Sequence, residues 1–189
     1  IVNGTLPVGL TLDSATGAIT GVPTTVVNAS FTVQVMDSAT PLATSTKALD
    51  IMILPSTVTI WPDTAVPGLI DGGPDRSVEL GVKFRSDVAG AVTGIRFYKA
   101  AANTGTHVAN LWSSSGTLLA TATYTNETAS GWQQVNFANP VQITANAVYI
   151  ASYHAPNGHY SADVNYFQNA GVDNPPLHAL VDGESGGNG

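Results

Sequence analysis

The sequence has no cysteine, few charged residues and no long apolar run, and each absence excludes a class of structure. Without cysteine, the 189-residue chain can form neither a disulfide framework nor a thiolate zinc site. No segment approaches the roughly 20 apolar residues that a membrane-spanning helix requires. The first residues lack the basic start and apolar stretch of a signal peptide, so we expect any export signal to lie upstream.

Charged residues make up only 10% of the chain, against roughly 25% in an average soluble domain. Thirteen acidic residues face six basic ones, which gives a net charge of −7. Binding to phosphates requires clustered lysine and arginine, so neither nucleic acid nor insertion into an anionic membrane is expected. Divalent cations and neutral, hydroxyl-rich ligands are compatible with this composition.

Apolar residues alternate with polar ones through most of the chain, which predicts an all-β fold. Alternation of period two indicates strands with one buried and one solvated face, as in antiparallel sandwiches. The alternating segments are 31–35, 58–61, 78–84, 95–98, 135–137 and 148–153. Turn-forming segments separate them, at 13–17, 71–74, 103–105, 114–116 and 156–158.

The distribution of aromatic residues predicts two consecutive modules. Phe31 is the only aromatic residue before Pro55, whereas all the tryptophans, all the tyrosines and the other phenylalanines follow it. We therefore place a boundary within 54–57, between modules 1–55 and 56–189. The first module is too short for a sandwich of about seven strands and about 100 residues. Either it borrows strands from a partner or the chain starts within the domain, and we expect it to expose a sheet edge.

The first module resembles the Ig-like, cadherin-like repeat of bacterial surface proteins. The resemblance rests on 6–24, which reads LPVGLTLDSATGAITGVPT, and on the strand 31–38, and it covers residues 1–54. Ser14 to Gly17 is expected to form a tight hairpin within it. The resemblance implies that the repeat's opening strands are missing, and that Asp37 lies near a calcium ion between modules.

The second module resembles the domain-of-unknown-function family numbered 4082. The matching segments run in order along the module: 81–84, 94–99, 103–107, 110–112, 131–137 and 153–160. The resemblance implies a jelly-roll-like β-sandwich in a large secreted bacterial protein, beside Ig-like repeats and carbohydrate-active domains. The family pattern continues past a glycine-rich loop, whereas this chain stops at 186–189, which implies a truncated sandwich.

The richest cluster of polar and aromatic residues surrounds the turn 156–158, and we predict a sugar-binding site there. Aromatic rings stack on sugar faces, and polar side chains bind hydroxyl groups. Trp132 is the second choice, although a core position is the favoured alternative for it and still more for Trp112. The predicted ligand-binding residues are Tyr153, His154, Asn157, His159, Tyr160 and Trp132.

Two further interpretations of the polar residues concern metals. The turn 156–158 could bring His154 and His159 together as metal ligands, but a structural loop is the favoured alternative. Asp71 and Asp75 flank a Gly-Gly-Pro segment and could supply half of a calcium site. If an ion binds, we therefore predict calcium, held by Asp71 and Asp75 or by Asp37; the alternative role for Asp37 is capping a turn.

No catalytic motif is present, since the sequence has no nucleophile elbow, phosphate-binding loop or metalloprotease helix. We therefore predict a non-catalytic segment of a secreted or cell-surface bacterial protein, acting in adhesion by binding polysaccharide. The alternative is a structural spacer that assembles with neighbouring copies of the same protein. An enzyme is the third hypothesis, and a paired-carboxylate glycosidase is disfavoured because Glu79, Glu127 and Glu184 are far apart in sequence.

Overall fold

The computed structural model describes residues 1–54 and 57–188, and the regular elements of these residues are all strands. In these ranges, no helix is long and apolar enough to cross a membrane. The chain divides into two compact units, Ile1–Val58 and Thr59–Gly189. Pro55 and Ser56, at which the sequence predicts the joint, lie outside the described residues. The all-β prediction is confirmed, with antiparallel pairing throughout.

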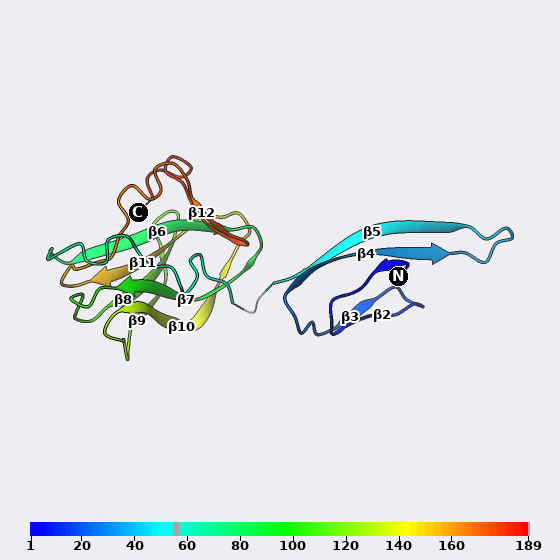
Figure 1. The fold of residues 1–189 in the computed structure, drawn as a ribbon, viewed down its shortest axis with the longest axis horizontal. Coiled ribbons are helices and arrows are strands. Elements are labelled where there is room, and N and C mark those ends of the chain that lie inside the picture. Colours follow the sequence, from blue (N-terminus) through cyan, green and yellow to red (C-terminus); the bar gives the residue numbers. More distant parts are fainter. Residues whose placement is uncertain (55–56, 189) are drawn as a thin grey trace. The chain divides into compact units, whose positions relative to one another are not determined.

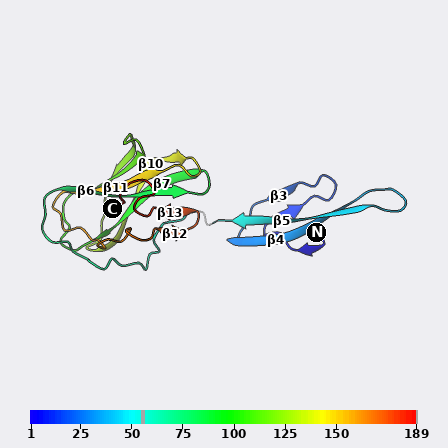
Figure 2. The ribbon, with the colours of Figure 1, turned by 90° about the horizontal axis from the view of Figure 1, so that it is seen from above.

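The first unit contains one three-stranded sheet and one hairpin. Its strands are β1 (Asn3–Gly4), β2 (Leu10–Leu12), β3 (Ile19–Gly21), β4 (Val27–Met36) and β5 (Thr44–Ile53). The sheet has the order β1-β4-β5, and β4 and β5 lie side by side along their whole length (Figure 1, Figure 2). The hairpin β2–β3 turns at the predicted place, where Gly17 has a φ of 75° and the Asp13 carboxylate accepts the Ala15 and Thr16 N–H groups.

The first unit has a very small core. Among its described residues, only Pro7 and Phe31 are buried. Apolar side chains on the long strands stay exposed, including Val35 and Met36 at 65% each. In the part of this unit that the structure describes, β5 pairs with β4 alone, so its other edge has no partner strand. So little burial offsets only a small part of the chain entropy lost on folding.

The second unit is a sandwich of two sheets. Its strands are β6 (Val78–Ser86), β7 (Gly90–Lys99), β8 (Val108–Ser113), β9 (Leu118–Thr123), β10 (Gly131–Ile143), β11 (Tyr149–Ala155), β12 (Val172–Asn174) and β13 (Leu177–Ala179). One sheet has six strands in the order β12-β13-β6-β11-β8-β9, and the other pairs β10 with β7. Four of the predicted strands correspond to β6, β7, β10 and β11.

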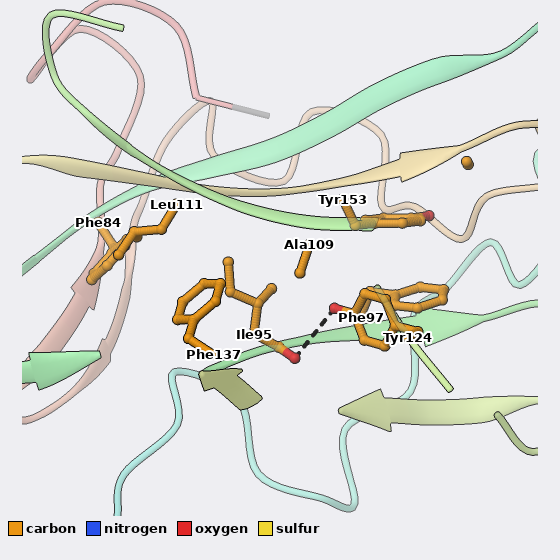
Figure 3. Close-up of a cluster of buried hydrophobic side chains, with 9 residues drawn as sticks. Phe84, Ile95, Phe97, Ala109, Leu111, Tyr124, Phe137 and Tyr153 are labelled. Atoms are coloured by element: carbon orange, nitrogen blue, oxygen red, sulfur yellow. Dashed lines mark hydrogen bonds between the residues drawn. The ribbon is translucent and has the colours of Figure 1, made fainter. Parts of the chain in front are cut away.

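The core of this unit lies between the two sheets (Figure 3). The rings of Phe97 from β7 and Tyr153 from β11 stack with centroids 4.2 Å apart. Tyr124 meets Phe97 edge-on, and its hydroxyl donates a hydrogen bond to the Ile95 carbonyl at 3.2 Å. Leu111 of β8 is fully buried. These contacts fix which face of β8 and β11 points inward, and therefore which residues face outward.

The predicted strand 58–61 is wrong, because this segment does not join a sheet. Side chains hold it instead of a backbone ladder. Ile60 packs against the core, the Thr59 hydroxyl donates to the Trp61 carbonyl at 2.7 Å, and the Asn174 amide donates to the Thr59 carbonyl at 2.8 Å. Alternation in so short a segment indicates only that one side of it is buried. A segment can bury one side without pairing with another strand, which is why the prediction failed here.

Candidate functional site: a groove on the outer face of the six-stranded sheet

The outer face of the six-stranded sheet carries Trp112. Successive strand residues point to opposite faces, and Ala109 and Leu111 are buried in the core. Asn110 and Trp112, which alternate with them, therefore point outward. The interpretation of Trp112 as a core residue is wrong. Trp112 shares the outward face of β8 with Asn110, so its indole is half-buried on the outer side of the sheet.

A chain of hydrogen bonds crosses this face over three neighbouring strands. The Trp112 Nε1–H donates to the Ser152 hydroxyl at 2.9 Å, and that hydroxyl donates to Glu79 Oε1 at 2.5 Å. The Asn110 amide donates to the same carboxylate oxygen at 2.9 Å. Each group has a defined role as donor or acceptor, so the indole and the carboxylate are held in fixed positions before any ligand arrives.

Gly81 forms the floor between these side chains. It lies opposite Ser152 in the β6–β11 register, and a Cβ atom at this position would lie only 2.9 Å from the Ser152 Cβ. Because no side chain fills this position, the face is hollowed into an open groove of about 440 Å³. We call it the Trp112 groove. Its lining residues are Glu79, Leu80, Gly81, Lys83, Trp112, Gly116, Ile150, Ser152, Gly187 and Asn188.

Lys83 holds the segment that lines the groove next to β6. Its Nζ donates to the carbonyls of Ser185 and Gly187 at 2.6 and 2.7 Å. The Asn188 side-chain amide bridges the Lys83 backbone, accepting its N–H at 2.5 Å and donating to its carbonyl at 3.1 Å. Two of the three ammonium protons are therefore used within the protein, and Lys83 acts mainly as a structural clamp.

Glu79 has one carboxylate oxygen bonded to neighbouring strands and the other beside His154. Its side chain is 39% exposed, and Oε1 already accepts the two bonds from Ser152 and Asn110. The neighbour of Oε2 is the His154 imidazole, whose Nδ1 lies 3.6 Å away, and the other ring nitrogen lies 3.0 Å from the Ser77 hydroxyl. Within the described ranges, no lysine or arginine pairs with Glu79. A carboxylate therefore lines the groove with His154 beside it and with no lysine or arginine partner among the described residues.

The structure separates the predicted sugar-binding residues. His154 lies beside Glu79 on the outer face, next to the groove. Tyr153 points the opposite way and is only 9% exposed, so its ring belongs to the core and cannot reach a ligand on the surface. Burial raises the pKa of its hydroxyl. The two residues were predicted together because they are adjacent, but adjacent strand residues face opposite sides.

The turn after β11 uses its polar groups to hold other loops. Asn157 donates to the Thr104 carbonyl at 2.8 Å, and His159 Nδ1 lies 2.9 Å from the Asp71 carboxylate. Tyr160 packs against the core. His154 and His159 therefore have separate partners and do not form the pair of metal ligands that was considered as the less favoured alternative. This arrangement favours the structural interpretation of the turn.

Trp132 is half-buried on the other sheet, and contacts within the protein already use its indole. Its Nε1–H donates to the Ala65 carbonyl at 2.8 Å. The Arg96 guanidinium lies 4.6 Å from the ring centroid, and Tyr98 meets the ring edge-on. Arg96 also pairs with Asp63 at 2.7 Å. These contacts tie the segment around residues 63–65 to the sheet, so Trp132 acts as an anchor for that segment.

The three carboxylates predicted to bind calcium each have local partners. Asp37 accepts the N–H groups of Ala39 and Ala43 at 3.2 and 2.9 Å, as in the turn-capping alternative. The Gly73 N–H and then His159 hold the pKa of Asp71 below its usual value. Asp75 accepts the N–H of Arg76 at 2.7 Å. Among residues 1–54 and 57–188, no three metal-ligating groups lie together. Calcium binding therefore stays a prediction.

Sequence reasoning missed most of the groove. Alternation in 78–84 places Glu79 and Lys83 on a solvated face, but nothing in the sequence places them beside Trp112. A usable signal was present in 108–112, where placing Leu111 in the core sends Trp112 outward. The same argument applied to β11 sends Ser152 outward when Tyr153 points inward. What the sequence did not show was which of the two alternating sets of residues in each strand faces the core, since both sets contain apolar residues.

Comparison with known families agrees with both resemblances. Residues 64–189 match the family described as "Domain of unknown function (DUF4082)", and residues 2–60 match the family described as "Putative Ig domain". No curated protein matches the chain. The combination indicates a module of a bacterial surface or extracellular protein. Since the first match spans more than half of the residues, the chain belongs to the DUF4082 family, and an Ig-like module precedes its DUF4082 domain.

Proposed function

We propose that the second unit binds polysaccharide without cleaving it, and that the Trp112 groove is its binding site. One observation carries the proposal: a half-buried indole on an open sheet face lies within two hydrogen bonds of a carboxylate that has no lysine or arginine partner among the described residues. An aromatic surface beside fixed acceptors matches a pyranose ring, which has apolar faces and hydroxyl groups around its edge.

The shape of the groove fits weak binding to a long chain. It is open, so each sugar ring would leave much of its surface in water. We expect a Kd of about 0.1 to 1 mM for one module, which corresponds to roughly 4 to 5.5 kcal/mol. Retention of the whole protein on a polysaccharide would then come from repeated modules, because linked binding sites add avidity.

The carboxylates support binding over hydrolysis. Glycosidases of the usual kind need two carboxylates on either side of the scissile bond. Glu79 is the one acidic residue among those that line the groove. Glu127 pairs with Lys99 and His107, Glu184 lies 3.5 Å from Arg85, and neither of them lines the groove. Glu79 is therefore assigned to hydrogen bonding with the ligand.

Affinity electrophoresis in gels that contain different polysaccharides tests the proposal. At least one neutral polysaccharide should retard the protein, and Trp112→Ala should abolish this retardation while leaving the fold intact. Tyr166→Ala is the matched control, because it removes an aromatic ring that is 45% exposed and absent from the groove lining. If Trp112→Ala migrates like the unmodified protein in the retarding gel, the groove is not the binding site.

The first unit favours a second candidate function, assembly with neighbouring copies of the protein. Its specific observation is the combination of a very small core with a ten-residue β5 that has one unpaired edge in the described residues. Such edges recruit strands from other chains. If no polysaccharide retards the protein and its mass in solution rises with concentration, assembly becomes the better account.

A further inference from the structure

We infer that Glu79 makes the Trp112 groove prefer glycans with free amino groups over neutral glycans of the same backbone, and both over acidic ones. The inference rests on the proposed function, since it concerns the ligand of the same groove. It names hexosamine polymers as the substrate class, meaning polysaccharides whose rings carry an ammonium group near a hydroxyl-rich edge.

The first step is the geometry of the carboxylate. Ser152 and Asn110 both donate to Oε1, so the carboxylate is fixed at the lining of the groove, with Oε2 beside His154 and free of bonds to lysine or arginine. The Trp112 indole is joined to the same Ser152 hydroxyl. A ring that stacks on Trp112 therefore has an edge substituent next to Glu79. An ammonium group there would form a charge-assisted hydrogen bond, which is stronger than a bond from a neutral hydroxyl.

The second step is the charge of the surroundings. The second unit contains ten acidic and five basic residues, a net charge of −5. Arg85, Arg96 and Lys99 are committed to ion pairs with carboxylates. Lys83, the one basic residue that lines the groove, is bonded to two carbonyls. The net negative charge of the unit therefore favours an amine over a uronic acid, while Lys83 keeps its positive charge in the lining.

The third step is the role of His154. Its imidazole approaches Oε2 at 3.6 Å, which is longer than a hydrogen bond, and its other nitrogen lies within hydrogen-bonding distance of Ser77. The neighbour of Oε2 is thus a histidine ring and not a lysine or arginine. A ligand ammonium would replace this histidine contact and would not have to break an ion pair with lysine or arginine.

Three β-1,4-linked hexasaccharides that differ only at carbon 2 test the inference by isothermal titration calorimetry. The glucose hexamer carries a hydroxyl there, the N-acetylglucosamine hexamer an acetamide and the glucosamine hexamer an amine. Under conditions that protonate the amine, we expect the glucosamine hexamer to bind about threefold to fivefold more tightly, the scale of an exposed ion pair. The preference should shrink as salt is raised from 50 to 500 mM, because salt screens the attraction between exposed charges. The screening length is roughly 10 Å at 0.1 M salt.

Two substitutions that each remove one negative charge distinguish direct contact between Glu79 and the ligand from long-range attraction by the charge of the whole unit. Glu79→Gln should abolish the preference and keep binding of the two neutral hexamers. Asp75→Asn removes a carboxylate that does not line the groove and should leave the preference unchanged. Equal binding of all three hexamers by the unmodified protein overturns the inference but leaves the proposed function standing. An equal loss in both variants also overturns it, and failure of all glycans to bind refutes the proposed function itself.

Discussion

Tyr153→Phe should stabilise the second unit and leave glycan binding unchanged. The Tyr153 ring stacks on Phe97 inside the sandwich, where phenylalanine would preserve the stacking and the volume. Its hydroxyl is buried and makes no hydrogen bond of good geometry among the described residues, although the Asn103 side chain is a polar neighbour. The substitution therefore removes a polar group that lost its water on folding and regained only a weak contact in return.

The expected gain follows from the cost of burying such a group. An unsatisfied buried hydroxyl costs about 1 to 3 kcal/mol, of which we expect roughly 1 kcal/mol to be recovered. For a unit of this size, about 1 kcal/mol raises the melting temperature by roughly 3 to 5 °C. Tyr153→Ala is the opposing control, because it also removes the ring and should destabilise the unit by about 3 to 5 kcal/mol.

Thermal unfolding and affinity electrophoresis of the two variants test this reasoning. The core assignment requires that Tyr153→Phe melts at or above the temperature of the unmodified protein and is retarded to the same extent. A loss of more than 1 kcal/mol would mean that the hydroxyl has a bonding partner. A loss of retardation without a loss of stability would mean that Tyr153 touches the ligand, as the sequence predicted, and would refute the outward assignment of Ser152 and Trp112.

Three further predictions concern stability. Hydrogen bonds to Asp173 and then Asp87 raise the pKa of His178. The stability that protonated His178 adds to the fold is therefore complete below the ordinary histidine pKa of about 6.5 and is lost as pH rises through the higher folded pKa. The melting temperature should therefore fall as pH rises above about 6.5, and this fall should flatten in His178→Gln. Phe31→Ala should remove any separate melting transition of the first unit without shifting that of the second, because Phe31 is one of two buried residues there. The calcium hypothesis, with Asp37 in its proposed role, predicts a higher melting temperature in millimolar calcium by mass action, and an unchanged temperature would exclude it.

The sequence alone determined the fold class and most of the strands. Strict alternation in 78–84 corresponds to β6, because a residue pattern of period two suits an extended chain with one buried face, and the β-branched and aromatic residues of 148–153 correspond to β11. The hairpin at Gly17 followed from local chemistry, since a positive φ favours glycine there. These features depend on neighbours in the chain, and such neighbours can be read from the sequence.

Only the tertiary structure decided which face of each strand is buried. The segments 108–112 and 148–153 carry apolar residues in both phases, so alternation alone left Trp112 and Tyr153 without a side. Packing of Leu111 and Tyr153 into the core turned Trp112 and Ser152 outward. The bond from Ser152 to Glu79 then joined residues 73 positions apart. The groove arises because three strands pair in a register set by the buried face, and that register depends on contacts between distant segments.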